Sequence, residues 1–233
     1  MAEIATLAAA LVVVVVVVAA RRCSPQIYDL VIINMTARWY ESVLAAVPEG
    51  ATVLDVGIGT ATALATQAHT VERKRLRFAG VDYDNAYVLA ARRRCEADVR
   101  LKDRVAVTCA SVYDAATLHQ LRPKGGFDAS FFSGSLTLMP DPPAALRAAA
   151  AVTKGGGRVY VTQTYQRRPV PFLRVLKPLL KYATTIDFGQ LTSERDAEAI
   201  FAESGLDVVE HMPIEGSVDT RFQCAYRTVL AVP

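Results

Sequence analysis

Asp55, Gly57 and Gly59 stand at alternate positions within residues 53–61 (VLDVGIGTA), where an apolar run passes into a turn. Glycines at such a place let a ligand approach the backbone closely, and the start of a following helix offers free N–H groups. The spacing therefore predicts a cofactor-binding loop. A dinucleotide fingerprint would need a third glycine where this chain has Thr62, which counts against a nicotinamide cofactor.

A second carboxylate, Asp82, follows the apolar run 77–81. A carboxylate at the end of a strand can accept two hydrogen bonds from the vicinal hydroxyls of a ribose. An acid in this position is by itself a generic feature. Its place behind the glycine loop makes Asp82 a candidate ligand for a nucleoside.

The pattern Asp55-x-Gly57-x-Gly59 resembles motif I of the class I S-adenosylmethionine-dependent methyltransferases, of the type that acts on small molecules or lipids. Ala61 stands where the family has its third glycine. The resemblance implies that this loop wraps the methionine part of S-adenosylmethionine and that Asp55 helps indirectly to hold it. The cofactor-binding residues it implies in this loop are Asp55, Val56, Gly57, Gly59 and Thr60.

The resemblance extends to three later segments. It implies that Asp82 binds the ribose and that Tyr83 lies on the adenine ring. Ser111 stands where the family has an acid that contacts the adenine amino group, and the N–H of Val112 is expected to donate to the ring. Residues 127–136 resemble motif IV, whose strand end opens onto the transferring methyl group, and Ser133 there is assigned to the cofactor.

No catalytic residue is assigned. Methyl transfer from a sulfonium needs alignment of the nucleophile and exclusion of water, and a base only when the nucleophile must lose a proton. The four cysteines lie far apart and no histidine stands at ligand spacing, so no metal site is predicted. A noncatalytic cofactor-binding module of the same fold stays open because of Ala61 and Ser111, and a nicotinamide-dependent oxidoreductase is the less favoured alternative.

The absence of certain motifs excludes several classes of methyl acceptor. No Asp/Asn-Pro-Pro-Tyr run follows the fourth strand, and no basic stripe with interleaved aromatics indicates nucleic acid. A small molecule or a lipid remains, and the sequence fixes neither the acceptor nor the oligomeric state. Candidates for the substrate side are Tyr28, Tyr40, Thr137 and Tyr165. For each tyrosine, packing in the domain with the hydroxyl in water is the alternative.

Strand and helix patterns alternate along the chain, which predicts one doubly wound α/β domain, a seven-stranded, mainly parallel sheet of the Rossmann-like methyltransferase type. Glycines 155–157 are expected to form a turn. The expected strands are 52–56, 77–81, 105–109, 127–132, 158–164, 208–211 and 225–232. The expected helices are 27–47, 60–70, 84–99, 142–152 and 193–203, with Asp84 and Ser193 as caps.

The N-terminus carries the apolar stretch 4–20, which includes seven consecutive valines and is followed by Arg21 and Arg22. A helix of that length would reach about 25 Å, close to the thickness of a thin bilayer core. Residues 1–22 are predicted to be an uncleaved transmembrane signal anchor and residues 23–233 the methyltransferase domain. The two arginines favour a cytosolic domain, for example at the endoplasmic reticulum. A cleaved signal peptide is the alternative.

Composition agrees with one globular domain and a membrane association. The 233 residues are 52% apolar, the mean hydropathy is +0.23, and the net charge of +3 does not indicate a nucleic-acid partner. Residues 165–182 carry five basic side chains, no acid and many apolar ones. Such a segment can lie on an anionic membrane surface, and a solvated helix packed on the domain is the alternative.

Overall fold

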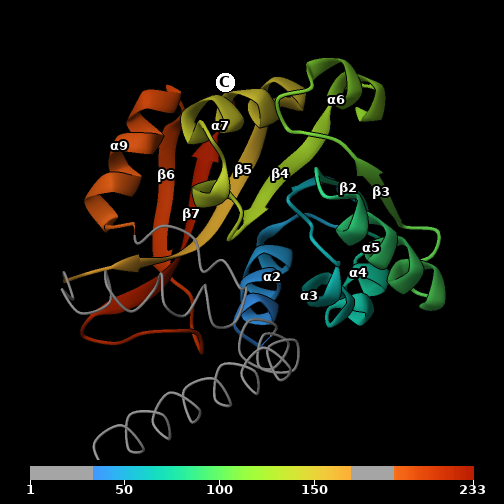
Figure 1. Ribbon diagram of the computed structural model, residues 1–233, viewed down its shortest axis with the longest axis horizontal. Helices are drawn as coiled ribbons and strands as arrows, with labels where there is room; N and C mark the ends of the chain where they lie inside the picture. Colours follow the sequence, from blue (N-terminus) through green and yellow to red (C-terminus); the bar gives the residue numbers. More distant parts are fainter. Residues whose placement is uncertain (1–33, 169–191) are drawn as a thin grey trace, which may run out of the picture.

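The computed structural model describes residues 34–168 and 192–233, and it contains one sheet of seven strands. The strand order is β3-β2-β1-β4-β5-β7-β6, and of these strands β7 alone runs against its neighbours. Helices cover both faces of the sheet (Figure 1). The predicted doubly wound, mainly parallel sheet is therefore confirmed.

The strands lie close to where the apolar runs placed them. Those of the parallel part are largely buried, as expected of strands covered on both faces. Their bounds are β1 Thr52–Val56, β2 Arg77–Asp82, β3 Val105–Cys109, β4 Phe127–Ser133, β5 Thr153–Gln166, β6 Asp207–Pro213 and β7 Gln223–Ala231.

Several helices begin at side-chain caps that satisfy their first free N–H groups. Asp84 and Asp141 accept from the backbone of α5 and α7, and Ser193 forms a capping box with Asp196 at α9. The helical bounds are α2 Asn34–Ala46, α3 Thr62–Ala65, α4 Ala68–Arg73, α5 Asn85–Ala97, α6 Ala115–Leu121, the 3-10 turn η2 Leu136–Leu138, α7 Pro142–Val152 and α9 Glu194–Ser204.

Three expectations about these elements were wrong. The single helix expected over residues 60–70 is two short helices, α3 and α4, because the hydroxyl of Thr66 bonds back to Ala63 O where α3 ends. Helix α6, capped by Asp114, was not predicted. Glycines 155–157 are not a separate turn but lie within β5, where the pairing with β4 shifts register.

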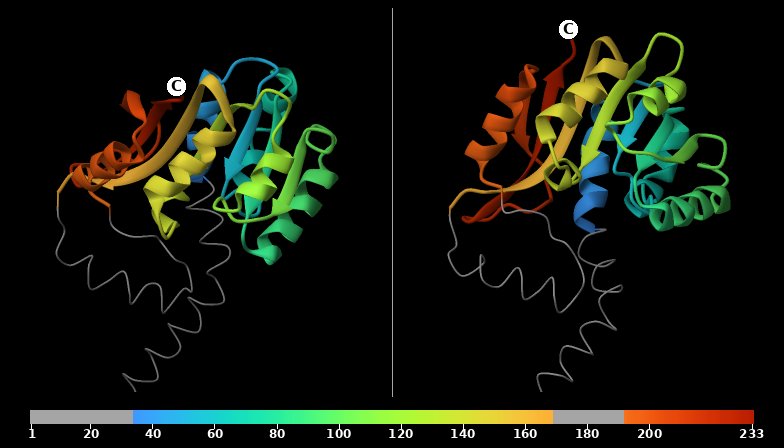
Figure 2. Two further views of the ribbon diagram at one scale, coloured as in Figure 1. Left: turned by 90° about the horizontal axis from the view of Figure 1, so that it is seen from above. Right: turned by 45° about the horizontal axis from the view of Figure 1, so that its top comes forward.

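Helices lie on both faces of the sheet (Figure 2), and the buried side chains accordingly form two core layers. Side chains of α2, α3, α4 and α5 fill one layer, together with Val53, Phe78 and Phe131 from the strands. Side chains of α6, α7 and α9 fill the other, with Phe132 and Val161. Both layers hold the strand ends rigidly, which is what a site at the edge of the sheet requires.

Helix α2 is fixed at its C-terminus by a buried lysine. Lys74, just before β2, donates from Nζ to Leu44 O at 2.6 Å, to Ala45 O at 3.2 Å and to Val47 O. These carbonyls lie at the helix C-terminus, where a cation also interacts favourably with the helix dipole. Since Lys74 precedes β2, the helix ends at the amino edge of the sheet and starts at the carboxyl edge.

No helix in the ranges 34–168 and 192–233 is long and apolar enough to cross a membrane. The anchor predicted at residues 1–22 lies outside the described residues. Of the basic segment 165–182, only residues 165–168 are described.

Replacing Lys74 by methionine tests the role of this side chain. The variant removes three hydrogen bonds from a charged group, and we expect the free energy of unfolding to fall by about 1–3 kcal/mol. Urea denaturation measures it, with Lys102→Met as the control because Lys102 is exposed. Equal stability of the two variants would show that Lys74 does not hold α2.

Candidate functional site

The loops that follow β1, β2, β3 and β4 meet at the carboxyl edge of the sheet, on either side of the boundary between β1 and β4. The chain winds outward in opposite directions from this boundary, because β2 and β3 lie on one side and β5 on the other. Ligands of open α/β sheets bind in the crevice at such a switch point. The predicted cofactor residues are all in these loops or at the ends of these strands.

The two glycines of the first loop have different tasks. Both have left-handed backbone conformations, with φ of 76° at Gly57 and 58° at Gly59. A Cβ at Gly57 would lie 2.5 Å from Cβ of Ser135, whereas a Cβ at Gly59 would meet nothing within 4 Å. Gly57 therefore permits close packing against the loop after β4. Gly59 leaves open space where a ligand can reach the backbone.

Ala61 shares the left-handed conformation, with φ of 55°. This conformation costs an ordinary residue roughly 1–2 kcal/mol, which explains why a glycine suits the position. The Ala61 side chain is buried in the core layer of α2 and α5. The departure from the glycine pattern therefore changes the packing beneath the loop and leaves its path intact.

Asp82 connects the first two predicted motifs directly. Its Oδ2 accepts from the N–H of Gly59 at 3.0 Å, and its Oδ1 accepts from the N–H of Asp84 at 2.9 Å. Burial raises the pKa of Asp82, and these backbone hydrogen bonds oppose the rise. Each carboxylate oxygen has a further lone pair, so the group can still accept from a ligand. Tyr83 beside it is 82% exposed, so its ring is accessible for stacking on a planar ligand.

The remaining polar side chains near the predicted cofactor site form hydrogen bonds within the protein. Ser111 is exposed and its Oγ accepts from the N–H of Tyr113 at 3.2 Å, while Val112 is buried. Thr60 Oγ1 lies 2.7 Å from Thr62 Oγ1. Asp114, a nearby carboxylate, is engaged in capping α6. These hydrogen bonds fix the loops that follow β1 and β3.

Asp55 is fully buried beneath the glycine loop. Its Oδ2 accepts from the hydroxyl of Tyr40 at 2.6 Å, and its Oδ1 has no hydrogen-bond partner among the described residues. Burial raises the pKa of Asp55 to about 7; the hydrogen bond from Tyr40 opposes this and the charge of Asp82 adds to it. A buried oxygen without a donor is costly, and a cationic or N–H-bearing ligand would relieve it.

The described residues among the substrate-side candidates have buried side chains or hydroxyl groups. Tyr40 is buried under the loop, edge-on to Phe131 at 4.9 Å between ring centroids, so it supports Asp55 and faces no open surface. Tyr165 is also buried, at the end of β5 beside His211. The Thr137 hydroxyl is buried without a partner among the described residues, and Tyr28 lies outside them.

Ser135 is a site residue that the sequence did not single out. Its side chain fills the space that Gly57 leaves, and its buried hydroxyl donates to Val56 O, which fixes the end of β1 to the loop after β4. Ser133 ends β4 two residues earlier, and its Oγ is buried with no partner in the described chain. A small residue after the strand was the available signal, but nothing in the sequence pairs it with Gly57.

Replacing Asp55 by asparagine tests its burial. The raised pKa means that the folded protein holds the proton more tightly than the unfolded chain, so wild-type stability falls as the pH rises from about 4 to 7. The variant keeps an acceptor for Tyr40 but cannot ionise. We expect its stability relative to wild type to rise by roughly 2–4 kcal/mol between about pH 4 and pH 8.

Urea denaturation at the two pH values measures this difference. Asp103→Asn is the control, because Asp103 is exposed and its stability difference should not change with pH in this way. A constant difference for Asp55→Asn would contradict an ionisable group buried at this position.

Comparison with known proteins bears on the crevice. Residues 53–157 match the family model described as a methyltransferase domain. Phosphatidylethanolamine N-methyltransferase of Cereibacter sphaeroides is 27% identical over 165 residues, which cover 71% of this chain and 74% of that protein. The family model, over residues 53–157, includes the glycine loop, Asp82 and the end of β4.

Solved structures show the same fold. Geranyl diphosphate C-methyltransferase from Streptomyces coelicolor A3(2), in complex with S-adenosyl-L-homocysteine, has a TM-score of 0.61 at 15% identity, over 84% of this chain and 78% of that one. A SAM dependent methyltransferase from Aquifex aeolicus has a TM-score of 0.58 at 18% identity, over 82% and 89%. With the glycine loop, its Asp82 partner and the match to a methyltransferase domain, this protein is an S-adenosylmethionine-dependent methyltransferase.

Proposed function

We propose that the protein transfers a methyl group to the amine of a membrane phospholipid of the phosphatidylethanolamine kind. The observation that carries this proposal is the 27% identity to phosphatidylethanolamine N-methyltransferase over most of both chains. The apolar residues 4–20 and the absence of an Asp/Asn-Pro-Pro-Tyr run after β4 agree with a lipid-type acceptor.

Unpartnered oxygens at the ends of β4 and β5 suit an amine. Ser133 Oγ, Thr137 Oγ1 and Gln163 Oε1 are buried and have no hydrogen-bond partner within residues 34–168 and 192–233. Leaving a buried acceptor without a donor costs about 1–3 kcal/mol. An acceptor molecule with N–H groups would supply such donors, and the hydrogen bonds would orient its nitrogen.

The residues of the chain have the tasks that this reaction demands. Bound S-adenosylmethionine supplies an activated methyl group on its sulfonium. Asp82 and the backbone around Gly59 hold the cofactor, and Tyr40 fixes the carboxyl group of Asp55 before the loop. The amine must be neutral to attack, and alignment then provides most of the rate enhancement.

The acceptor is tested with full-length protein, S-adenosylmethionine labelled in its methyl group, and vesicles containing phosphatidylethanolamine. We expect the label in the N-methylated lipid after organic extraction and chromatography. Vesicles of phosphatidylcholine, which has no N–H, should remain unlabelled. A protein that binds the cofactor yet transfers no label to phosphatidylethanolamine would refute the acceptor and leave the activity class in place.

Asp82→Asn tests how the cofactor is held. The change removes the charge that bonds to Gly59 and faces the crevice, and we expect the dissociation constant for S-adenosylmethionine to rise about 10- to 100-fold. Titration calorimetry measures it and circular dichroism checks the fold. Asp103→Asn, an exposed acid outside the crevice, should bind like the wild type, and wild-type affinity in Asp82→Asn would contradict the assignment.

We also propose that residues 4–20 anchor the protein with its domain on the cytosolic side, where S-adenosylmethionine is made. The seven valines gain by leaving water, whereas Arg21 and Arg22 resist crossing the bilayer by roughly 2.5–3.5 kcal/mol each. The balance of these costs supports an uncleaved segment with both arginines in the cytosol.

The anchor predicts three results for the full chain with a C-terminal tag. The protein should keep its N-terminal segment, resist alkaline extraction, and lose the tag to protease in intact microsomes. Val15→Asp, which places a charge mid-segment, should make it extractable. A mature N-terminus at Arg21 or a protected tag would overturn this topology.

A further inference from the structure

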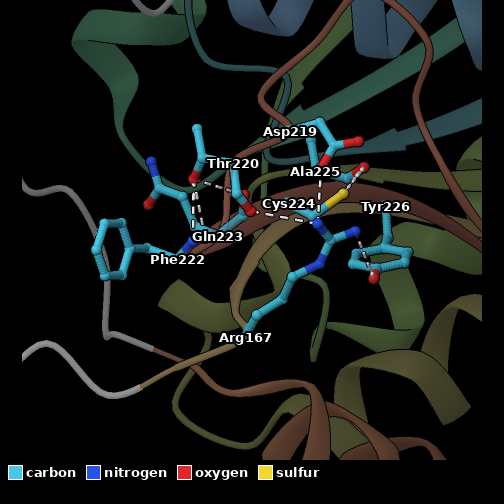
Figure 3. Close-up of polar contacts among 8 residues, drawn as sticks. All are labelled: Arg167, Asp219, Thr220, Phe222, Gln223, Cys224, Ala225 and Tyr226. Carbon is cyan, nitrogen blue, oxygen red and sulfur yellow. Dashed lines mark hydrogen bonds and ion pairs between the residues drawn. The ribbon is translucent and has the colours of Figure 1, made fainter.

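The turn between β6 and β7 presents an arginine and a phenylalanine at the surface. Thr220 closes the turn, because its N–H donates to Gln223 O at 2.9 Å and its Oγ1 accepts from the N–H groups of Phe222 and Gln223. Phe222 is 41% exposed, and Cζ of Arg221 lies 4.5 Å from the centroid of its ring. Figure 3 shows the Phe222 ring directed away from the polar contacts behind it.

Arg167, at the end of β5, holds this turn in place (Figure 3). Its guanidinium donates to Asp219 Oδ1 at 2.7 Å, to Thr220 O at 3.2 Å and to Tyr226 Oη at 3.3 Å. Its backbone N–H donates to Phe222 O at 2.9 Å. These hydrogen bonds fix the conformation of the turn. The neighbouring acid, Asp219, is already paired with Arg167.

The charge that remains exposed at the turn is positive. Arg168, whose N–H reaches Phe222 O at 3.4 Å, and Arg221 form no ion pair with any acid in the described parts of the chain. The Phe222 ring is exposed with Arg221 against it, and Arg168 is exposed just after the end of β5. This combination matches an anionic bilayer, since the ring can enter the interface and the arginines can meet lipid phosphates.

The turn lies at the carboxyl edge of the sheet, together with other exposed side chains and the ends of the described ranges. Because β6 runs parallel to β5, its connection to β7 lies at the carboxyl edge, together with the exposed side chains Tyr83 and Leu138. Helix α2 also starts at this edge, and β5 ends there. The first described range therefore both begins, at Asn34, and ends, at Arg168, on this edge.

We propose that the turn Thr220–Gln223 is a docking point for an anionic bilayer, with Phe222 entering the interface and Arg168 and Arg221 meeting the lipid phosphates. The docking directs the carboxyl edge, and with it the cofactor crevice, towards the lipid. This inference deepens the proposed function by naming the surface through which a lipid acceptor would be reached.

The test uses full-length protein and vesicles of phosphatidylcholine and phosphatidylglycerol with brominated acyl chains, which quench tryptophan inside the bilayer. Phe222→Trp places a reporter in the turn. Val99→Trp is the matched control, since Val99 is 86% exposed and follows α5 at the opposite edge of the sheet. The native Trp39 is buried and contributes the same background to both.

We expect several-fold stronger quenching of the tryptophan at position 222 than at position 99. Adding Arg221→Glu should weaken the quenching on the anionic vesicles and change it little on phosphatidylcholine alone. Equal quenching at both positions, or none at either, would overturn the proposal. Insensitivity to Arg221→Glu on anionic vesicles would overturn its electrostatic part.

The outcome is independent of turnover. Quenching at position 222 without methylation of phosphatidylethanolamine would retain the docking surface and discard the acceptor. Methylation without quenching would do the opposite. Calorimetric binding of S-adenosylmethionine to each variant verifies that the domain is folded, because neither Phe222 nor Val99 contacts the crevice residues described above.

Discussion

The site depends on the way the end of β2 holds the loop that follows β1. The N–H groups of Gly57 and Ile58 both donate to Val81 O, and the next residue, Asp82, accepts from Gly59. Two neighbouring parallel strands thus define the path of a loop that contains two left-handed glycines. These β2 contacts, together with the packing of Gly57 against Ser135, select one path among the many that glycines allow. The carboxylate that orders the loop is also the one that we expect to bind the ribose.

Helix α2 gives this edge its second support. Lys74 fixes its far end, Tyr40 in its middle bonds to Asp55, and Trp39 donates to Ser217 in the connection between β6 and β7. The Trp39 ring also fills the space above Gly134, where a Cβ would lie 2.9 Å from it. One helix therefore links the cofactor loop, the end of β4 and the proposed bilayer-docking turn. A displacement of α2 would therefore alter the packing of all three segments.

Local patterns sufficed for most of the fold and for part of the site. Apolar runs fixed the strands, acids such as Asp84 marked helix starts, and the spacing of Asp55, Gly59 and Asp82 identified the crevice. Contacts between distant segments could not be predicted in this way. The sequence does not show that Tyr40 reaches Asp55 or that Ser135 fills the space at Gly57, because each pair is joined only by the fold.

Two of the misjudged features have a similar cause. The glycines at 155–157 look like a turn, but Val232, directly after β7, exchanges backbone hydrogen bonds with Gly156 and Gly157 and keeps them in the sheet. Tyr40 looks like a substrate-facing residue on an amphipathic helix, but the acid beneath the loop draws its hydroxyl inward. In both cases tertiary partners override the local preference.

The two carboxylic acids at the ends of β1 and β2 favour a cationic cofactor, because a nearby cation stabilises their ionised forms. Asp55 and Asp82 lie close enough for their charges to interact, and S-adenosylmethionine carries a sulfonium and an ammonium group. The most direct test is titration calorimetry of the full-length protein with S-adenosylmethionine and, separately, with NAD. The structure predicts saturable binding of S-adenosylmethionine and no heat of binding with NAD. Tight NAD binding without a response to S-adenosylmethionine would contradict the assignment of the crevice.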